Sequence, residues 1–451
     1  MQKSRLKTEL TNKVRNRNAK IAVIGLGYVG LPTAAVFADA GFPVTGVDIK
    51  NEIVETVSQG KSDVKEPGLN DLLRKVITKG KLKATTKTVK AVKKADITII
   101  CVQTPLNKRK QPNLEYLKKA CKKVAAGLSK GKLVIVESTV PPGTTKNMVR
   151  TILEKTSGLR CGEDFWLVHC PERILPGNAL KELTENSRII GGYTKDSSEI
   201  AFELYKRITQ GTLLITDCTS AEIAKLSENA FRDVNIAFAN ELALICEEVG
   251  VDVQEAIALA NTHPRVKIHS PGCGVGGPCL PKDPCLLLHP VARKKAKFGV
   301  MKPSRELNDY MPDHTVQLVI QALKRNGKAP EKSKVALLGL SYKGNSNDAR
   351  NSPAERIIHG LTAQGIEIVV YDPLCEENFG SAKARNISEA VHKVDCIVVT
   401  TDNTMFKKLD LKKIRTLTND NPAIVDGRRI INPSDAKKYG FYYVGIGCSH
   451  A

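Results

Sequence analysis

A glycine-rich loop that ends at a cysteine is the segment of this chain best suited to covalent chemistry. Residues 271–283 read PGCGVGGPCLPKD. Four of these residues are glycines, at Gly272, Gly274, Gly276 and Gly277. Glycine lets the backbone adopt positive φ angles and lets a ligand approach closely. Cys279 is followed by Lys282 and Asp283, and a nearby ammonium favours the reactive thiolate, so Cys279 is a candidate nucleophile. A turn around a buried cysteine would explain the same residues.

A second motif, near the start of the chain, predicts a cradle for a dinucleotide. Gly25, Gly27 and Gly30 form a GxGxxG sequence that follows the apolar run 21–24 and opens a helix-like segment. The next strand ends at Asp48. This order of strand, glycine turn, helix and acidic residue is the context that distinguishes a dinucleotide site from a chance glycine cluster. The helix N-terminus would bind the pyrophosphate, and Asp48 would accept from a ribose 2′-hydroxyl and repel a 2′-phosphate, so we expect NAD.

Composition limits the class of protein. The chain has 451 residues, enough for two or three domains. No apolar run reaches membrane-spanning length and the N-terminus lacks a hydrophobic signal, which predicts a soluble cytoplasmic protein with no membrane partner. The 12 cysteines are scattered without CxxC pairs; Cys273, Cys279 and Cys285 are evenly spaced, but no histidine follows at zinc-finger spacing. We expect reduced thiols and no metal site.

The net charge of +22 raises the question of a nucleic-acid partner. The basic residues are spread along the chain without interleaved aromatics or a helix-turn-helix pattern, so no nucleic-acid partner is expected. The excess positive charge suits an anionic substrate and a pyrophosphate cofactor. Residues 1–19 contain little apolar sequence and are predicted to be a basic mobile arm. Its basic residues are Lys3, Arg5, Lys7, Lys13, Arg15 and Arg17.

Residues 20–216 alternate strand-like and helix-like segments. This pattern predicts a parallel sheet covered by helices on both faces. The strand candidates are residues 21–24, 43–47, 97–102, 133–136, 166–169, 188–191 and 213–216. Thr104 and Thr139 follow two of these strands at their carboxyl ends, which is the edge where open α/β sheets bind ligands.

Residues 217–330 change to long helical patterns. Thr219 to Glu222 have the residue types of a helix cap, and a helix is predicted to run from there through Glu248. Lys225, Asn229 and Arg232 share one face of this helix. Such a stripe is also what the solvated side of an amphipathic helix looks like. Further helices are predicted at residues 253–261 and 304–326.

A second α/β pattern fills residues 331–451. Strands are predicted at residues 335–338, 366–371, 396–400 and 423–425, with a helix that starts at Pro353. The turn after the first of these strands lacks a full GxGxxG motif. The sequence therefore predicts two nucleotide-binding-like units around a helical middle.

Residues 20–447 carry blocks that resemble the UDP-glucose/GDP-mannose dehydrogenase family of nucleotide-sugar 6-dehydrogenases. The resemblance implies two Rossmann-like, doubly wound parallel-sheet domains (NAD-binding, residues 20–216, and UDP-sugar-binding, residues 331–451), joined by a central long-helix dimerisation region at residues 217–330. The blocks are the glycine turn with Asp48, ESTVPPG at 137–143, PERILPG at 171–177, KLSENAFR at 225–232, the cysteine loop at 271–283, YKG at 342–344 and DAR at 348–350.

The resemblance also implies a reaction. The C6 hydroxyl of a nucleotide sugar would be oxidised twice at the expense of two NAD⁺, and Cys279 would hold the intermediate as a thiohemiacetal and then a thioester. Lys225 would stabilise the developing alkoxide. Asn229 and Asp283 would hold the water and assist proton transfer, and Glu172 would act in thioester hydrolysis to the uronate.

Binding residues are implied in the same way. Arg265 would reach the substrate of a neighbouring subunit, which implies a homodimer, whereas for His263 a turn-capping role before Pro264 stays open. The positions that match NAD contacts in the family are Gly25, Gly27, Tyr28, Val29, Gly30, Asp48, Thr104, Thr139 and Arg350. Those that match nucleotide-sugar contacts are Arg173, Ile174, Lys225, Asn229, Arg232, His263, Arg265, Gly276, Tyr342 and Lys343.

The substrate is expected to be a UDP-N-acetylhexosamine. Glucose-type enzymes usually carry an aromatic residue after Glu172, whereas this chain has Arg173, and segments 231–241 and 261–266 resemble the branch that acts on UDP-N-acetyl-D-mannosamine. Pro278 and Lys282 depart from that branch, so UDP-N-acetylglucosamine and UDP-N-acetylgalactosamine stay open as substrates. Two functions of a different kind also stay open: a non-catalytic NAD-binding regulatory or nucleic-acid-binding relative, and a one-step hydroxy-acid dehydrogenase.

Overall fold

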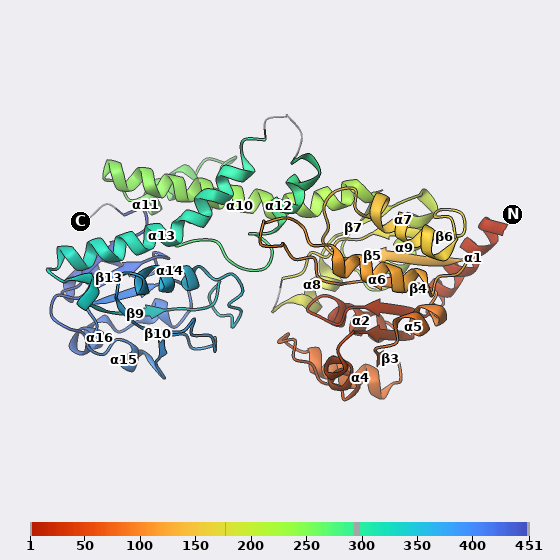
Figure 1. Cartoon of the computed structure of the whole chain (residues 1–451), viewed down its shortest axis with the longest axis horizontal. Helices are drawn as coiled ribbons and strands as arrows, with labels where there is room; N and C mark the ends of the chain where they lie inside the picture. The colour runs from red at the N-terminus through yellow and green to blue at the C-terminus, as the bar shows by residue number, and fades with distance from the viewer. Residues whose placement is uncertain (1, 176, 293–297, 449–451) are drawn as a thin grey trace. The chain divides into compact units, whose positions relative to one another are not determined.

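The chain folds into two compact units (Figure 1). The computed structural model describes residues 2–175, 177–292 and 298–448, so Pro176 of the PERILPG block lies outside the described residues. One unit comprises Met1–Glu228 with Cys285–Lys294, and the other comprises Asn229–Pro284 with Lys295–Ala451. The long helix α10 (Cys218–Val249) begins in the first unit and ends in the second.

The described part of the first unit contains an eight-stranded sheet in the order β3-β2-β1-β4-β5-β6-β7-β8. Its strands are β1 (Ile21–Ile24), β2 (Val44–Val47), β3 (Leu82–Thr85), β4 (Ile97–Ile100), β5 (Lys132–Val136), β6 (Phe165–His169), β7 (Arg188–Gly192) and β8 (Leu213–Asp217). The predicted all-parallel pairing is wrong at one place, because β7 runs antiparallel to β6. Strand β3 was not predicted, since its sequence LKAT has no run of β-branched residues and it pairs on one side only.

Helices cover both faces of this sheet. One face packs against α2 (Gly30–Asp39), α4 (Leu69–Thr78), α8 (Ala179–Glu185) and α9 (Lys195–Tyr205). The other packs against α5 (Thr88–Lys94), α6 (Glu115–Ala125), the π-helical turn η1 (Thr145–Val149) and α7 (Arg150–Ser157). Helix α3 (Asn51–Ser58) contacts β3. Because both faces are covered, the central strands are buried along their whole length.

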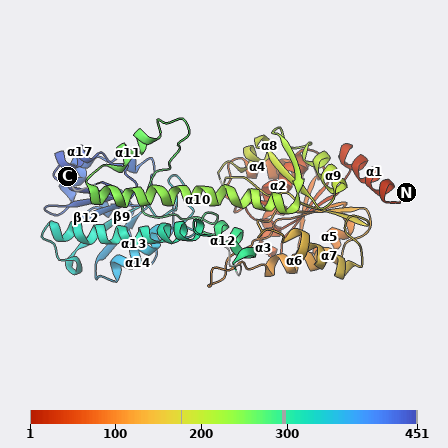
Figure 2. The ribbon, with the colours of Figure 1, turned by 90° about the horizontal axis from the view of Figure 1, so that it is seen from above.

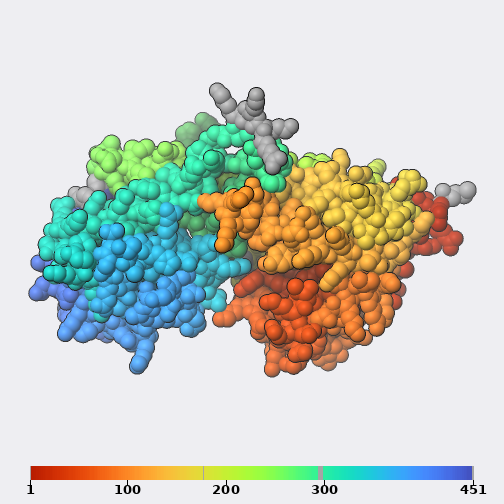
Figure 3. Space-filling model, in the orientation of Figure 1, coloured from red at the N-terminus to blue at the C-terminus, as the bar shows by residue number. Residues whose placement is uncertain are grey.

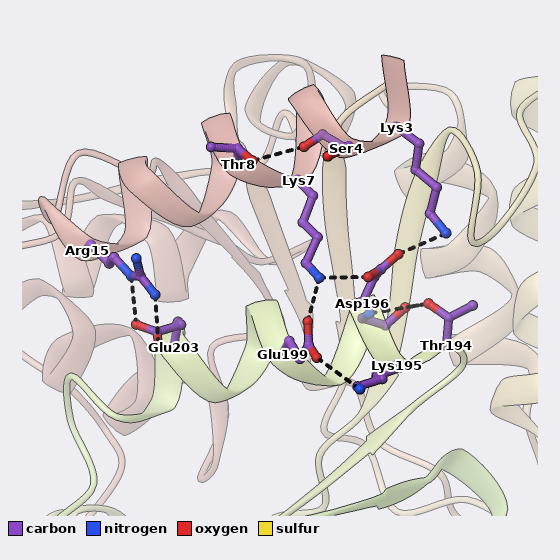
Figure 4. A network of polar contacts seen from close by, with 11 residues as sticks. Lys3, Ser4, Lys7, Thr8, Arg15, Thr194, Lys195, Asp196, Glu199 and Glu203 are labelled. Atoms are coloured by element: carbon purple, nitrogen blue, oxygen red, sulfur yellow. Dashed lines mark hydrogen bonds and ion pairs between the residues drawn. The ribbon is translucent and has the colours of Figure 1, made fainter. Parts of the chain in front are cut away.

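The N-terminal segment is a helix, not the predicted mobile arm. Helix α1 (Gln2–Arg15) buries Leu10 and Val14 against the first unit, and three of its basic side chains face acidic ones on α9 (Figure 4). Lys7 pairs with Asp196 at 2.7 Å, and further pairs are formed by Lys3 and Arg15. In the space-filling view the red atoms of this segment lie against the yellow surface of the same unit (Figure 3). The basic residues that suggested a solvated arm instead form ion pairs that hold α1 against α9.

The described part of the second unit contains a six-stranded parallel sheet in the order β11-β10-β9-β12-β13-β14. Its strands are β9 (Lys334–Leu338), β10 (Glu367–Tyr371), β11 (Ala382–Lys383), β12 (Cys396–Val399), β13 (Ala423–Asp426) and β14 (Tyr442–Gly445). The short edge strands β11 and β14 were not predicted. Register is continuous across the centre, where Ala336 of β9 pairs with both Val369 and Ile397.

Two groups of helices cover the second sheet. Helices α13 (Met301–Arg325) and α14 (Pro353–Thr362) pack on one face together with the end of α10 and with α11 (Val253–Ala260). Helices α15 (Ile387–Ala390), α16 (Leu411–Leu417) and α17 (Pro433–Lys438) pack on the other. The short elements α12 (Asp283–Leu288), η2 (His289–Val291), η3 (Pro330–Lys332) and η4 (Phe406–Lys408) complete the described chain. None of the described helices combines the length and the apolar composition needed to cross a membrane.

Asp217, not the predicted Thr219–Glu222 cap, holds the N-terminus of α10. The Asp217 carboxylate accepts hydrogen bonds from the backbone N–H groups of Thr219 (2.9 Å) and Ser220 (3.2 Å). An aspartate just before a helix is a favoured cap because its oxygens satisfy first-turn donors. Glu222 is thereby left to make contacts outside its own helix.

Candidate active site

The first glycine turn has the geometry that a pyrophosphate needs. Gly25 has φ of +97°, and a Cβ at Gly30 would lie 1.9 Å from the carbonyl oxygen of Gly25. At Gly27, by contrast, a Cβ would meet no atom within 4 Å. The turn is therefore closed on its inner side, where strand and helix pack, and open at Gly27, where a ligand could approach the backbone. These residues fit a dinucleotide.

Asp48 is tied to this turn. Its Oδ2 accepts a hydrogen bond from the backbone N–H of Leu26 at 2.9 Å, and its Oδ1 accepts one from Lys50 at 3.0 Å. A carboxylate has about four acceptor positions, so two stay available for a ribose hydroxyl. Asp48 thus shapes the turn as well as offering the acceptor expected from the sequence.

The same turn recurs in the second unit although its sequence lacks the full motif. Gly339 follows β9 with φ of +107°, and its N–H donates to the Tyr371 carbonyl at 2.9 Å. The Asp372 carboxylate accepts from the backbone N–H of Leu340 at 2.8 Å. The glycine with positive φ and the aspartate at the end of the neighbouring strand are therefore the shared structural elements.

The other predicted NAD contacts of the first unit lie at the carboxyl edge of its sheet. The buried Thr104 hydroxyl donates to the carbonyl of Thr139 at 2.6 Å, which joins the segments after β4 and β5. Tyr28 is exposed in the glycine turn, and Val29 directly precedes α2. Parallel strands bring their carboxyl ends to one edge, which is why residues so far apart in sequence lie on it.

Glu172 belongs to a buried charged cluster of the first unit. The buried Arg188 guanidinium lies 3.5 Å from Glu172 and 3.7 Å from Glu137, and it also lies over the ring of Tyr205. The Tyr205 hydroxyl donates to Glu137 at 2.7 Å. Burial raises the pKa of Glu137, and the nearby Glu172 carboxylate acts in the same direction. The Arg188 guanidinium opposes this rise, since a nearby cation favours the ionised carboxylate.

Two other predicted residues of this unit lie beside Glu172. Arg173 forms an ion pair with Glu228 at 2.7 Å and donates to the carbonyl of Ser187 at 2.9 Å. Ile174 is half-buried against the core.

Lys225, on α10, is half-buried, and its ammonium makes no hydrogen bond or ion pair within the described residues. It is a cation available to a ligand.

The cysteine loop lies within the second unit and is held at several points. Gly274 and Gly277 have φ of +134° and +88°, and Gly277 donates its N–H to the carbonyl of Arg350 at 3.0 Å. A Cβ at Gly276 would lie 2.5 Å from the carbonyl oxygen of Asn351. Glycine is therefore required where the loop passes the segment that precedes α14.

Cys279 is exposed at the end of this loop, beside a buried amide and carboxylate pair. The side chain of Asn229 donates to Asp283 Oδ2 at 2.6 Å, and these residues are 7% and 1% exposed. The N–H groups of Lys282 and Asp283 donate to the Cys279 carbonyl at 3.0 and 2.9 Å. Lys282 also lies 3.9 Å from the Asp283 carboxylate. The amide of Asn229 and the ammonium of Lys282 thus lie near the Asp283 carboxylate, and backbone hydrogen bonds tie Asp283 to Cys279.

Further predicted residues surround Tyr342. Burial raises the pKa of Tyr342, and the negative charges of Asp348 and Cys279 act in the same direction, while Arg350 and Arg232 oppose them. Arg350 itself is held by the Asp348 carboxylate at 2.5 Å. The Tyr342 ring lies against the cysteine loop, since a Cβ at Gly277 would be 2.9 Å from it. Lys343 is half-buried beside Tyr342.

His263 and Arg265 lie apart from this group, exposed in the turn after α11. The backbone N–H of Arg265 donates to His263 Nδ1 at 3.4 Å, and the Arg265 side chain approaches the other ring nitrogen at 3.5 Å. This geometry supports the turn-capping role for His263. The Arg265 side chain is exposed, as the predicted contact with a neighbouring subunit would require.

Sequence reasoning missed Glu222. Its carboxylate accepts from the backbone N–H groups of Gly143 (2.5 Å) and Thr145 (2.8 Å), in the segment that follows Thr139. Burial raises the pKa of Glu222 to about 7, although these donors act in the opposite direction. The only sequence signal was an acidic residue on the inner face of a predicted helix. Arg428, which lies against Gly272 of the cysteine loop, was also missed.

Three domains of the UDP-glucose/GDP-mannose dehydrogenase family match the chain. The NAD binding domain matches residues 19–209, the central domain residues 219–310 and the UDP binding domain residues 336–433. The chain belongs to this family.

Individual members of the UDP-glucose/GDP-mannose dehydrogenase family agree over nearly the whole length. UDP-N-acetyl-D-mannosamine dehydrogenase from Pyrococcus horikoshii is 44% identical over 428 residues, which cover 95% of this chain and 99% of that protein. The solved UDP-D-ManNAc dehydrogenase structure from the same organism has a TM-score of 0.89 at 43% identity, and covers 96% of this chain and 100% of its own. The NDP-N-acetyl-D-galactosaminuronic acid dehydrogenase structure from Methanosarcina mazei Go1 has a TM-score of 0.86 at 35% identity, with 98% of both chains covered.

Membership of the UDP-glucose/GDP-mannose dehydrogenase family confirms several predictions. The fold class, two parallel-sheet α/β domains with a central helical region, is correct. The chain is an NAD-dependent nucleotide-sugar dehydrogenase whose substrate class is UDP-sugars.

Proposed function

We propose that this dehydrogenase oxidises the C6 hydroxyl of a UDP-N-acetylhexosamine to the carboxylate in two successive steps, with UDP-N-acetyl-D-mannosamine as its substrate. The observation that carries the proposal is the exposed Cys279 at the end of a tightly held glycine loop, next to the buried Asn229–Asp283 pair. A one-step dehydrogenase has no use for a nucleophile there, because a single hydride transfer needs no covalent intermediate.

The first glycine turn and the sheet edge beside it are the proposed NAD site. NAD⁺, when bound, supplies the acceptor for each hydride. The open backbone at Gly27 and the N-terminus of α2 would bind the pyrophosphate. Asp48 would accept from the adenosine ribose, and Tyr28, Val29, Thr104, Thr139 and Arg350 would complete the contacts.

The two oxidations are linked through sulfur. Loss of a proton and a hydride turns the C6 alcohol into an aldehyde, and Lys225 would stabilise the oxygen as its proton leaves. The Cys279 thiolate then adds to the aldehyde carbon, and the oxygen takes up a proton to give a thiohemiacetal. Loss of a second hydride and of the hydroxyl proton gives a thioester. Covalent capture keeps the reactive aldehyde from escaping between the steps.

Hydrolysis of the thioester completes the reaction. Water adds to the thioester carbon, the carbon–sulfur bond breaks, and the uronate and the thiolate are released. The Asn229 amide and the Asp283 carboxylate are suited to orient the water and to accept its proton. Glu172 would assist this step, supported by its place in a cluster where two carboxylates share Arg188.

Polar and cationic residues would recognise the UDP-sugar. The contacts proposed for it are those of Arg173, Ile174, Lys225, Asn229, Arg232, His263, Arg265, Gly276, Tyr342 and Lys343. The N-acetyl group distinguishes the substrate from UDP-glucose, since polar groups built to pair with an amide stay unsatisfied in its absence. The chain is similar to UDP-N-acetyl-D-mannosamine dehydrogenase from Pyrococcus horikoshii over 95% of its length, and this similarity supports the mannosamine epimer as substrate. The similarity to the Methanosarcina mazei enzyme supports the galactosamine epimer as the second candidate.

A homodimer built on α10 is part of the proposal. Phe231, Phe238 and Ile245 are exposed on this helix at intervals of seven residues, so they form one apolar stripe. Large apolar side chains exposed in a row mark a protein interface. A second copy of the chain would cover the stripe by presenting its own, and its Arg265 would then reach the substrate of the first copy.

Measuring NADH formation with purified protein and a panel of UDP-sugars tests this function. UDP-N-acetyl-D-mannosamine should give two NADH per uronate, and the other N-acetylhexosamines and UDP-glucose should react more slowly. One NADH per sugar, with free aldehyde as product, would contradict the thioester route. No NADH from any UDP-sugar, together with salt-sensitive binding to nucleic acid, would favour a non-catalytic relative.

A further inference from the structure

A chain of buried polar side chains connects two helices of the second unit to the start of the cysteine loop. Asp233 and Asn240 come from α10, and Arg305 and Asn308 come from α13; each is 5% exposed or less. The two helices run side by side within this unit (Figure 2). None of the four residues belongs to the proposed catalytic or binding set.

The hydrogen bonds that link these buried side chains have a fixed direction. The backbone N–H of Gly272 donates to Asn240 Oδ1 at 2.9 Å, so the Asn240 amide nitrogen must point to Asn308, where it donates to Oδ1 at 2.8 Å. The Asn308 nitrogen in turn donates to Asp233 Oδ1 at 2.9 Å and to the Asp233 carbonyl at 2.8 Å. Arg305 pairs with the same carboxylate. Because a backbone N–H can only donate, Gly272 sets the orientation of both amides.

Buried polar side chains destabilise a fold unless they are hydrogen-bonded. Apolar contacts alone could hold the two helices together, so helix packing does not explain this network. What the network adds is a bond to the loop at Gly272. A second asparagine of α10 holds the residues just before: Asn235 donates to the carbonyl of Lys267 at 3.1 Å and accepts from the N–H of His269 at 2.8 Å. Helix α10 therefore fixes the approach to the cysteine loop at two places.

The sheet of the second unit holds the same residues from another direction. The N–H of Cys273 donates to the carbonyl of Gly427 at 3.0 Å. A Cβ at Gly272 would lie 2.7 Å from the Arg428 guanidinium, so the Arg428 side chain packs against this glycine. The segment is thus clamped between the helices and the sheet, and a change at Asn240 would release one side of the clamp.

We infer that Asp233, Asn308 and Asn240 are positioning residues for Cys279: their directed hydrogen bonds fix the start of the loop that presents the nucleophile. Burial raises the pKa of Asp233, and the paired Arg305 guanidinium opposes this and favours the ionised carboxylate that accepts these bonds. The inference rests on the proposed function, in which Cys279 reacts. A small displacement of a reacting group costs much of the rate, so loosening this anchor should slow the chemistry.

The direction of the bonds provides a sharp test. Asn308→Asp places a carboxylate against Asp233 and removes the donor between them. The double variant Asp233→Asn/Asn308→Asp keeps the total charge and restores the side-chain pairs, since Asn240 and the new amide can both donate to the new carboxylate. We expect Asn308→Asp to lower kcat by about tenfold to a hundredfold, with the KM for NAD changed much less, because all the proposed NAD contacts except Arg350 belong to the other compact unit. The double variant should recover most of kcat.

Alkylation of Cys279 by iodoacetamide supplies a second measurement that needs no substrate. The rate is followed against pH on the full chain, and the Cys279→Ser protein gives the background. Asn308→Asp and the milder Asn240→Ser should both change the pH profile of alkylation, and the double variant should return it to that of the wild type. Asn240→Ser serves as the test if Asn308→Asp does not fold.

Two outcomes would overturn the inference. One is a lower melting temperature in these variants with wild-type kcat and wild-type alkylation, which would make the network purely structural. The other is a double variant as impaired as Asn308→Asp, which would show that bond direction is irrelevant. Failure of the proposed function would be recognised separately, as a wild-type protein that oxidises no UDP-sugar while the alkylation comparison still gives its answer.

Discussion

The side-chain amide of Asn229 donates a 2.6 Å hydrogen bond to the carboxylate of Asp283, and both groups are almost completely buried. Asn229 lies on α10, whereas Asp283 is the last residue of the cysteine loop and the first of α12, so this bond joins α10 to the loop that carries Cys279. A carboxylate held in this way keeps its orientation, which is what a group that accepts a proton from water requires.

Asp283→Asn should therefore lower kcat by about a hundredfold to ten-thousandfold, the usual size of a general acid–base contribution. The substitution preserves the shape of the residue and removes only its charge and basicity. Quenched-flow measurement should show the second hydride transfer completed and the thioester accumulating. A melting temperature close to that of the wild type would show that the fold is intact, and an unchanged kcat would contradict the catalytic role of Asp283.

Cys279→Ala should abolish uronate formation, and Cys279→Ser should at most accumulate an ester that hydrolyses slowly, because an alkoxide is a poorer leaving group than a thiolate. The expected result is measured by mass spectrometry of the intact protein and by uronate assay. Cys121→Ala is a matched control, since burial raises the pKa of the Cys121 thiol to about 12 and makes it inert. Uronate formation at the wild-type rate by Cys279→Ala would make this cysteine structural.

Asp48→Asn should raise the ratio of NADP to NAD use, measured as kcat/KM for each cofactor. Asparagine keeps an oxygen that can accept from the Leu26 N–H, so the turn should persist while the charge that repels a 2′-phosphate is lost. Asp48→Ala removes both and should also weaken NAD binding. Equal use of both cofactors by the wild type would contradict the role given to Asp48.

The α1 ion pairs should stabilise the first unit at neutral pH and low salt. Lys3 and Lys7 lower the pKa of Asp196, and Arg15 lowers that of Glu203. A carboxyl whose pKa is lower in the folded state adds stability above its unfolded pKa, and this contribution is lost as pH falls through the folded value. Lys7→Ala/Arg15→Ala should thus lower the melting temperature at about pH 7, with the difference shrinking as pH falls below the ordinary pKa of Asp and Glu at about 4.

Salt provides the control for this prediction, because ions screen exposed pairs. The difference between the wild type and Lys7→Ala/Arg15→Ala should shrink as the salt concentration rises. A difference that is the same at every pH and salt concentration would assign the effect to lost packing around Leu10 and Val14 instead.

The sequence predicted those parts of the fold that depend on neighbouring residues. Apolar runs such as 97–102 indicated β4, and the order of glycines with Asp48 indicated the turn that the structure contains. The loop that carries Cys279 was also found from local spacing. In each case the physical cause, a buried strand or a backbone that needs glycine, acts within a few residues.

Features that depend on distant residues were missed. Helix α1 was expected to be mobile because its partners on α9 lie almost 200 positions along the chain. The antiparallel direction of β7 is decided by how the chain returns to the sheet edge, which no local pattern encodes. Glu222 and Asn240 act through bonds to Thr145 and Gly272 on other elements, so their roles could not be read from periodicity.

The proposed dimer can be tested by mixing two inactive variants. If Arg265 completes the site of the other subunit, a hybrid of an Arg265→Ala and a Cys279→Ala chain has one site with both defects and one intact site. Co-refolding equal amounts should restore about a quarter of the wild-type activity towards UDP-N-acetyl-D-mannosamine, since about half of the dimers are hybrids with one working site each. Asn229→Ala mixed with Cys279→Ala is the control: both residues act in the site of their own chain, so no hybrid site is intact. Absence of rescue in the first mixture, with hybrids present by native mass spectrometry, would contradict the shared site.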